Sequence, residues 1–270
     1  MSTIQTETVQ SDTFSLEIYE ETLLKAKQLG YTFPTVSELK NGAHKHGRFL
    51  LIRHDVDTSP SYALQMARLE HRLGVRSSYF VLMHCPYYNP AAPPHWDALR
   101  EIIGMNFEVG LHYDTTFFEE RGMDILEGVR RDAAALENIL DVDIVSVSQH
   151  RPASSPFIKQ LNEYYVDAYN NDLVNGIHYI SDSGFKWRGR TLLDCLGTEE
   201  RIHALIHPLT WMFGDLDMAG TYGRVGAELS ASLNLSLEGL IDSTQQYLQN
   251  RERLDQTRRD RYKENAGGAA

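Results

Sequence analysis

Cysteine is scarce in this sequence of 270 residues, which contains only Cys85 and Cys195. Two cysteines cannot build the disulfide framework of a small secreted protein, and their separation matches no zinc knuckle. We therefore expect two buried thiols in a reducing compartment. The sequence also lacks a run of the roughly 18 to 20 apolar residues that a membrane-spanning helix needs. Residues 1–14 lack the basic start and apolar core of a secretory signal. These absences predict a cytoplasmic protein with no membrane span.

Basic residues are also few relative to acidic ones. The sequence contains 26 Lys and Arg and 37 Asp and Glu, which gives a formal net charge of −11. Binding to phosphate groups needs a positive field, so we expect no nucleic-acid partner. The sequence has no glycine-rich loop of the kind that holds nucleotide phosphates. Hydrophobic residues at 42% and charged residues at 23% are typical of a globular protein, which excludes disorder, collagen and coiled coil for the bulk of the chain.

The length fits one large domain, and the sequence shows neither an internal repeat nor a linker that would divide it. We expect a polar N-terminal segment at 1–14, a single globular domain at 15–250 and a charged, partly disordered tail at 251–270. A helix is expected at 235–262, with apolar residues near its start only. The arginines of the tail alternate with acids, which favours a solvated face over a binding site.

Between the tails, short apolar runs alternate with amphipathic segments. The expected strands lie at residues 48–53, 77–83, 107–112, 144–148, 166–169, 178–181 and 203–206. The expected helices lie at residues 62–73, 96–103 and 123–140. This alternation predicts an α/β fold with a mainly parallel sheet flanked by helices, and the length suits a barrel-like closure.

Ionisable side chains follow four of the expected strands at the point where each strand ends. They are His54, Asp55 and Asp57, then His112 and Asp114, then His150 and Arg151, and finally His207. In parallel α/β folds the strands point the same way, so these ends meet at one rim, where active sites lie. We therefore expect a functional site at this rim.

Asp55 and Asp57 are two positions apart, so in an extended chain their carboxylates point to the same side. Paired acids with imidazoles nearby suit a divalent metal and a general base. Asp57 could instead cap the helix that follows Thr58-Ser59-Pro60. Asp114 could orient His112, although a histidine at a strand end is often only hydrogen-bonded structure. Arg151 could fix a carboxylate or form a buried structural salt bridge.

Five short motifs occur in a fixed order over residues 49–211. They are Arg-His-Asp-Val-Asp at 53–57, Gly-Leu-His at 110–112, His-Arg-Pro at 150–152, Ser-Asp-Ser-Gly at 181–184 with Trp-Arg at 187–188, and Leu-Ile-His at 205–207. Together they resemble the motifs of polysaccharide deacetylases, carbohydrate esterase family 4 in the NodB-homology superfamily. The resemblance implies a distorted (β/α) barrel and metal-dependent removal of acetyl from an N-acetylated sugar. It also implies a bound divalent metal, with zinc favoured over cobalt, nickel or manganese.

The resemblance also implies roles for individual residues. The catalytic residues would be Asp55 as the base, His207 as the general acid, Arg151 as the arginine that steadies the base and Asp182 as the acid of the following motif. The metal ligands would be Asp57 and His112, and Trp187 would line the sugar pocket. Domain 15–250 would then be a deacetylase-like catalytic domain.

The sequence departs from the family pattern at three places. Val56 separates two acids that are usually adjacent, so their roles stay open. Thr116 occupies the position of the second metal-binding histidine; we expect His150 to complete the ligand set, with Asp114 in reserve. Ala153 and Ser154 replace an aromatic segment that helps to hold the oxyanion in the family.

The substrate is expected to be an N-acetylated sugar or saccharide precursor used in cell-surface polysaccharide biosynthesis, for example of the O-antigen type. In the segment 84–94, His84 and Tyr87, with Tyr88, could contact it, or the tyrosines could pack inward in a surface connector. Two alternatives remain. One is a catalytically inactive carbohydrate-binding protein on the same fold. The other is a hydrolase of a formamide or another non-sugar amide.

Overall fold

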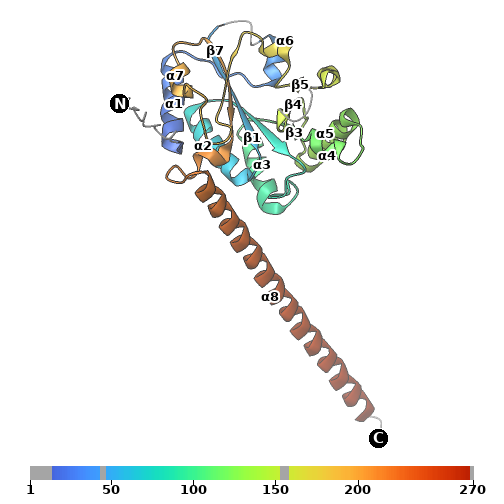
Figure 1. Ribbon diagram of the computed structural model, residues 1–270. Helices are drawn as coiled ribbons and strands as arrows, with labels where there is room; N and C mark the ends of the chain where they lie inside the picture. Colours follow the sequence, from blue (N-terminus) through green and yellow to red (C-terminus); the bar gives the residue numbers. More distant parts are fainter. Residues whose placement is uncertain (1–13, 43–46, 153–157, 268–270) are drawn as a thin grey trace, which may run out of the picture. The chain divides into compact units, whose positions relative to one another are not determined.

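The computed structural model describes residues 14–42, 47–152 and 158–267, with side chains up to residue 259. The chain divides into two compact units, Met1–Met218 and Ala219–Ala270. The second unit consists of the helix α8, Met218–Gly267, so the expected tail at 251–270 is helical as far as Gly267 (Figure 1). The expected polar segment at 1–14 falls almost wholly outside the described residues. Among the described helices, none combines the length and the apolar character needed to cross a bilayer.

The first unit contains a seven-stranded sheet with the strand order β5-β4-β3-β2-β1-β7-β6. All six pairings between neighbouring strands are parallel, as the sequence predicts. The strands are β1 (Phe49–Val56), β2 (Ser78–Leu82), β3 (Glu108–Tyr113), β4 (Ser146–Gln149), β5 (Val166–Asp167), β6 (His178–Ser181) and β7 (Arg201–Ile206). The strand β1 lies inside the sheet, between β2 and β7, and continues past the expected end at residue 53.

The sheet curls on itself, and side chains on its inner face show this. Four strand spacings separate β1 from β5, which would be about 19 Å in a flat sheet. Yet residues of β1, β2 and the β5 segment form one buried cluster that includes Phe49, Leu51, Phe80, Val166 and Ala168. The sheet is therefore a curled half-barrel surrounded by helices, and the predicted distorted (β/α) barrel is confirmed.

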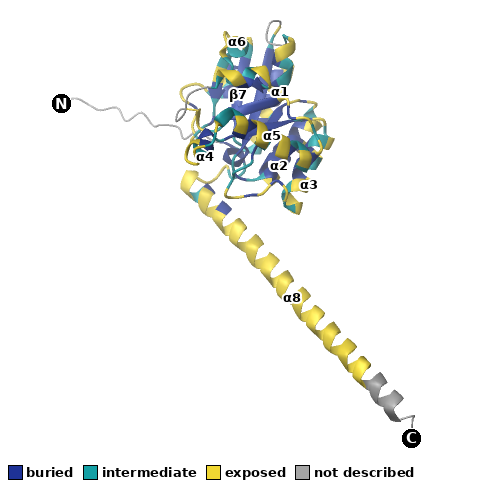
Figure 2. Cartoon of the chain, turned by 90° about the vertical axis from the view of Figure 1, so that its right-hand side faces the viewer, coloured by how far each residue is buried: buried dark blue, intermediate teal, exposed yellow. Residues whose placement is uncertain are grey.

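The helices bury their apolar faces against the outside of the sheet, and Figure 2 shows the buried residues gathered there. They are α1 (Leu16–Gln28), α2 (Pro60–Leu73), α3 (Pro93–Gly104), α4 (Thr115–Glu119), α5 (Ile125–Leu140) and α7 (Leu192–Cys195). The short helix α6 (Asn171–Val174) has no buried residue and packs against the inner cluster through Leu173 and Val174. The expected helices at 62–73, 96–103 and 123–140 correspond to α2, α3 and α5. The helix α1 was not predicted from the sequence.

The helix α2 begins and ends at residues suited to these positions. The Ser59 side chain accepts a hydrogen bond from the Ser61 N–H, Pro60 occupies the first turn, and Gly74 closes the helix at φ 66°. The N-cap is therefore Ser59, and the alternative that Asp57 caps this helix is wrong. The Asp57 carboxylate remains available at the rim of the sheet.

A buried carboxylate joins two outer helices to the sheet. Glu70 of α2 is fully buried and accepts hydrogen bonds from the hydroxyls of Tyr19, Ser77 and Tyr79, at 2.5 to 2.7 Å. Its Oε1 also lies 2.7 Å from Nε2 of His54 on β1. His54 thus points to the outer face of β1, and its neighbour Asp55 points to the inner face.

Gly110 on β3 faces the inner cluster at a point where no side chain fits. A Cβ atom there would lie 2.5 Å from the Phe80 ring and 2.8 Å from the Ser146 carbonyl oxygen. We expect Gly110→Ala to lower the free energy of unfolding by about 1–3 kcal/mol, because the buried ring and the backbone must shift. Urea unfolding followed by circular dichroism measures this. Gly104→Ala is the matched control: nothing lies within 4 Å of its new Cβ, and α3 should not be weakened. Equal stability of the two variants would contradict this packing.

Candidate functional site

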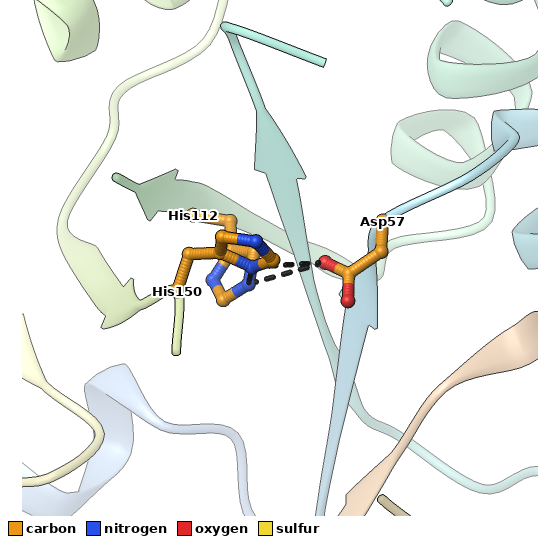
Figure 3. Close-up of side chains that lie close together, drawn as sticks. All are labelled: Asp57, His112 and His150. Atoms are coloured by element: carbon orange, nitrogen blue, oxygen red, sulfur yellow. Dashed lines mark hydrogen bonds and ion pairs between the residues drawn. The ribbon is translucent and has the colours of Figure 1, made fainter. Parts of the chain in front are cut away.

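Three ligand-type side chains meet at the rim formed by the carboxyl ends of the strands. Asp57 follows β1, His112 lies near the end of β3, and His150 follows β4 (Figure 3). The Asp57 Oδ1 atom lies 3.2 Å from His112 Nε2 and 3.5 Å from His150 Nδ1. The two imidazole nitrogens are 3.1 Å apart. We call these residues the ligand triangle.

The ligand triangle has the dimensions of one face of a tetrahedral metal site. Zinc ligands about 2.0–2.1 Å from the metal in tetrahedral geometry are separated by about 3.3 Å. The three distances in the structure, 3.1, 3.2 and 3.5 Å, lie around this value. An aspartate and two histidines are also common zinc ligands, and three protein ligands leave a fourth position open, as in catalytic sites. The residues therefore fit a divalent metal.

The orientation of His112 is fixed by the backbone of the neighbouring strand. Its Nδ1 lies 2.9 Å from the Ser148 carbonyl oxygen, so the Nδ1–H donates there and leaves the Nε2 lone pair facing Asp57. Such a backbone partner is typical of a histidine that binds metal. The ring is almost fully buried, which limits other orientations.

The electrostatics of the ligand triangle favour a positive charge between its members. Burial by itself would raise the pKa of Asp57, but His112 and His150 outweigh it and hold that pKa well below its usual range. Burial lowers the pKa of His112, yet Asp55 and Asp57 raise it by more. Both shifts reflect attraction between the carboxylates and the positively charged imidazoles, and a metal ion between them would be stabilised in the same way.

Asp55 lies beside the ligand triangle on the same face of β1. Its Oδ2 atom is 3.7 Å from His112 Nε2, and its Oδ1 accepts a 3.3 Å hydrogen bond from the Ser148 hydroxyl. The Arg53 guanidinium contacts both carboxylate oxygens, with Nε 3.2 Å from Oδ1 and Nη2 3.2 Å from Oδ2. This fork fixes the plane of the Asp55 carboxylate.

Arg53 is therefore a site residue that the sequence analysis missed. It is fully buried, its Nη2 donates to the Tyr169 hydroxyl at 2.6 Å, and its guanidinium lies over the Tyr169 ring at 4.4 Å. The signal was present, because Arg53 precedes Asp55 by two positions and so shares its face of the strand. Arg151, for which the motif resemblance implies this role, is exposed and has φ 48°; its role stays a prediction.

His207 approaches the ligand triangle from β7, on the other side of β1. Its Nδ1 lies 2.6 Å from Asp182 Oδ1, and its Nε2 lies 3.8 Å from Asp57 Oδ2. Burial lowers the pKa of His207, but Asp182 and then Asp57 more than compensate and raise it to about 9. The imidazole is thus held as a proton donor aimed at the rim.

The buried Asp182 carboxylate also accepts hydrogen bonds from the His207 backbone N–H and from the Trp211 indole N–H, the latter at 2.8 Å. Trp211 was not singled out in the sequence, although it follows His207 by one helical turn. A pocket opens at this point. It is lined by Asp55, Val56, Asp57, Thr58, Ser59, His207, Pro208 and Leu209.

Asp114, the alternative candidate for the third metal ligand, makes its contact at the start of α4 instead. It caps α4, where its Oδ1 accepts a 3.0 Å hydrogen bond from the Thr116 N–H. The structure brings His150, the residue expected to complete the ligand set, next to Asp57 and His112, and its role as a metal ligand stays a prediction. Ala153 and Ser154 lie outside the described residues.

The three predicted sugar contacts lie in different surroundings. Trp187 is largely buried, with its ring 5.5 Å from Phe14 and 6.1 Å from Trp211. His84 stacks on Phe117 at 3.5 Å and pairs with Asp132. Tyr87 is 47% exposed in the segment after β2. Contact of these residues with a substrate stays a prediction.

Tyr88, in the same segment as Tyr87, packs inward. Its hydroxyl donates to the Val56 carbonyl oxygen and accepts from the Leu82 N–H. The segment is thus anchored to the end of β1, next to Asp57, and Tyr87 is its outward-facing aromatic side chain.

Comparison with known proteins gives solved structures only. No family model matches the chain, and no curated protein matches its sequence. Peptidoglycan deacetylase PdaC from Bacillus subtilis is 14% identical, with a TM-score of 0.43 over 60% of this chain and 76% of that one. A putative polysaccharide deacetylase involved in O-antigen biosynthesis from Bordetella bronchiseptica is 16% identical, with a TM-score of 0.42 over 66% and 79%. The Streptococcus pyogenes deacetylase PplD is 10% identical, with a TM-score of 0.43 over 78% and 91%.

We expect the purified chain to bind one zinc ion, and His112→Ala and His150→Ala to weaken that binding by at least tenfold. Each substitution removes one corner of the ligand triangle. Isothermal titration calorimetry of zinc into the chelator-treated protein measures the affinity. Thr116→Ala and the exposed His71→Ala are the controls and should bind like the parent chain. Loss of zinc in Thr116→Ala with full binding in His150→Ala would contradict this ligand set.

Proposed function

We propose that the chain is a metal-dependent hydrolase that removes the acetyl group from an N-acetylated sugar. The observation that supports this most directly is the ligand triangle with a carboxylate on one side and a charged imidazole on the other. Asp55 lies beside His112, and His207 lies beside Asp57, so both flank the candidate metal site. This is the arrangement that amide hydrolysis needs: a place for water, a base and an acid.

The residues Asp57, His112 and His150 would hold the metal ion. When bound, a divalent ion supplies Lewis acidity for the acetyl carbonyl and lowers the pKa of water towards neutrality. The fit of the three donor atoms to zinc makes zinc our proposal for the ion.

Asp55 is the proposed general base. Its carboxylate lies within 3.7 Å of a ligand atom, so a water molecule at the open position is within its reach. Arg53 and Ser148 hold both carboxylate oxygens, which keeps Asp55 oriented towards the rim. The carboxylate accepts a proton from the water as the water attacks the acetyl carbon.

His207 is the proposed general acid. The departing amine is a poor leaving group unless it receives a proton, and the raised pKa of His207 keeps its imidazole protonated at neutral pH. Asp182 accepts from Nδ1–H and so directs the Nε2–H towards Asp57 and the pocket. The Trp211 indole N–H donates a hydrogen bond to Asp182 Oδ2 and so helps to fix the position of this carboxylate.

The proposed substrate is an N-acetylated sugar or saccharide precursor used in polysaccharide biosynthesis, as the motif resemblance implies. Tyr87 and His84, after β2, would contact the sugar, and Trp187 would line the sugar pocket. The inactive, carbohydrate-binding alternative is less well supported. A binding protein has no need of a base, an acid and a ligand triangle that face one another.

Loss of the acid should separate catalysis from metal binding. We expect His207→Gln to lower the rate of acetate release from N-acetylated oligosaccharides by roughly 10²–10⁴-fold, because the amine then leaves without its proton. A coupled acetate assay on the zinc-loaded protein measures the rate, and metal analysis of the same sample should still give one zinc per chain. Parent-like turnover in His207→Gln would exclude His207 as the acid.

Arg53 and Arg151 can be compared directly as partners of the base. We expect Arg53→Lys to lower kcat by about 10–100-fold with little change in KM, because lysine cannot contact both Asp55 oxygens. Arg151→Ala should retain kcat within about twofold. Steady-state kinetics gives both constants, and thermal unfolding establishes that each variant is folded. A larger loss of kcat in Arg151→Ala than in Arg53→Lys would instead identify Arg151 as the residue that orients Asp55.

A further inference from the structure

Arg53, the partner of the proposed base, is itself held by few hydrogen bonds. Its Nη2 atom donates to Asp55 Oδ2 at 3.2 Å and to the Tyr169 hydroxyl at 2.6 Å. Its Nε lies within ion-pair distance of Asp55 Oδ1, but neither Nε nor Nη1 donates a hydrogen bond within the part of the chain that the structure describes. Tyr169 is therefore the only described residue besides Asp55 that accepts a hydrogen bond from this guanidinium.

Tyr169 contacts the guanidinium in two separate ways. Its ring lies 4.4 Å from the Arg53 Cζ atom, and its hydroxyl accepts from Nη2. The ring attracts the cation without preferring one of its nitrogen atoms, whereas the hydrogen bond fixes which nitrogen lies beside Asp55. Burial raises the pKa of Tyr169 by more than the Arg53 charge lowers it, so the hydroxyl stays neutral and acts as a hydrogen-bond partner.

The backbone of Tyr169 is tied to the sheet by a buried carboxylate. The Tyr169 N–H donates to Asp167 Oδ1 at 2.8 Å, and Asp167 Oδ2 accepts a 3.0 Å hydrogen bond from the Tyr113 hydroxyl. Both Asp167 and Tyr113 are fully buried, and Tyr113 follows His112 on β3. The turn after β5 is thus fixed to the strand that carries a member of the ligand triangle.

A second tyrosine lies beside Tyr169 but does not bind Arg53. Tyr179 is on β6, at the opposite edge of the sheet from β5, and the two rings are 6.5 Å apart. The Tyr179 side chain is half exposed, and its hydroxyl has no hydrogen-bond partner among the described residues. The pair of tyrosines therefore offers a matched comparison, in which only the Tyr169 hydroxyl holds the guanidinium.

We propose that Tyr169 is a positioning residue for the base Asp55, which it orients through Arg53. The proposal rests on the proposed function, because it takes Asp55 as the base. Without the Tyr169 hydroxyl, the guanidinium can turn about its Cζ–Nε bond and no longer holds both Asp55 oxygens. The carboxylate then faces the attacking water for less of the time. Tyr169 is not among the residues that line the pocket, so the effect falls on kcat and not on KM.

Steady-state kinetics of the zinc-loaded protein tests the role of the hydroxyl. Tyr169→Phe keeps the ring, and we expect kcat for acetate release to fall about tenfold with unchanged KM and zinc affinity. Tyr179→Phe is the matched control and should keep the parent kcat. In the Arg53→Lys background, Tyr169→Phe should change kcat by less than about twofold, because an ammonium group has no plane to orient. Parent-like kcat in Tyr169→Phe, or an equal loss in both backgrounds, would overturn the proposal.

The orientation of Arg53 can also be measured without turnover. In ¹⁵N NMR of arginine side chains, Nη1 and Nη2 give separate signals when rotation about the Cζ–Nε bond is slow, and Arg53→Lys assigns the signals by their loss. We expect Tyr169→Phe to speed the exchange between the two Arg53 signals about tenfold, and Tyr179→Phe to leave it unchanged. Unchanged exchange in Tyr169→Phe would overturn the proposal whatever the activity. Faster exchange in a chain that releases no acetate would refute the proposed hydrolase and still support the orientation of Arg53 by Tyr169.

Discussion

The burial of one guanidinium group beneath the rim connects the fold to the site. A buried arginine is costly unless its charge is paired, and Arg53 pairs its charge with Asp55 and donates from Nη2 to Asp55 and to the Tyr169 hydroxyl. Asp55 is on the interior strand β1, whereas Tyr169 follows β5 at one edge of the sheet. The two partners meet at Arg53 only because the sheet is curled. The same contact that satisfies the charge therefore closes the half-barrel and orients the proposed base.

Successive side chains of β1 point alternately to the inner and the outer face of the sheet, so the strand contributes buried polar residues to both faces. Arg53 and Asp55 point inward, and His54 between them points outward to Glu70, which in turn holds Tyr19 and Tyr79. Shifting this strand by one residue would exchange the two sets and leave buried charges without partners on both faces. The register that stabilises the outer helices is thus the register that assembles the site.

The sequence predicted the elements whose signals are local. Short apolar runs predicted the strands. Polar residues at the strand ends predicted that Asp57, His112, His150 and His207 lie together at one rim of the sheet. The end of β1 was placed at residue 53 because polar residues follow, yet these residues are buried by partners far along the chain. Arg53 was missed for the same reason: arginine is almost never fully buried unless paired, and the pair with Tyr169 spans 116 residues.

The proposed use of His150 as a ligand, in place of a residue at the position of Thr116, would have a structural consequence. Thr116 lies in α4, held by the Asp114 cap, whereas His150 follows β4, and its backbone N–H donates to the Tyr113 carbonyl oxygen of β3. All three members of the ligand triangle thus follow or end strands of one sheet, whose hydrogen bonds fix their spacing. Sites built on such elements are held more closely than sites on loops. The segment after β2 and the connections around Trp187 are then free to differ in substrate contacts without moving the ligand atoms.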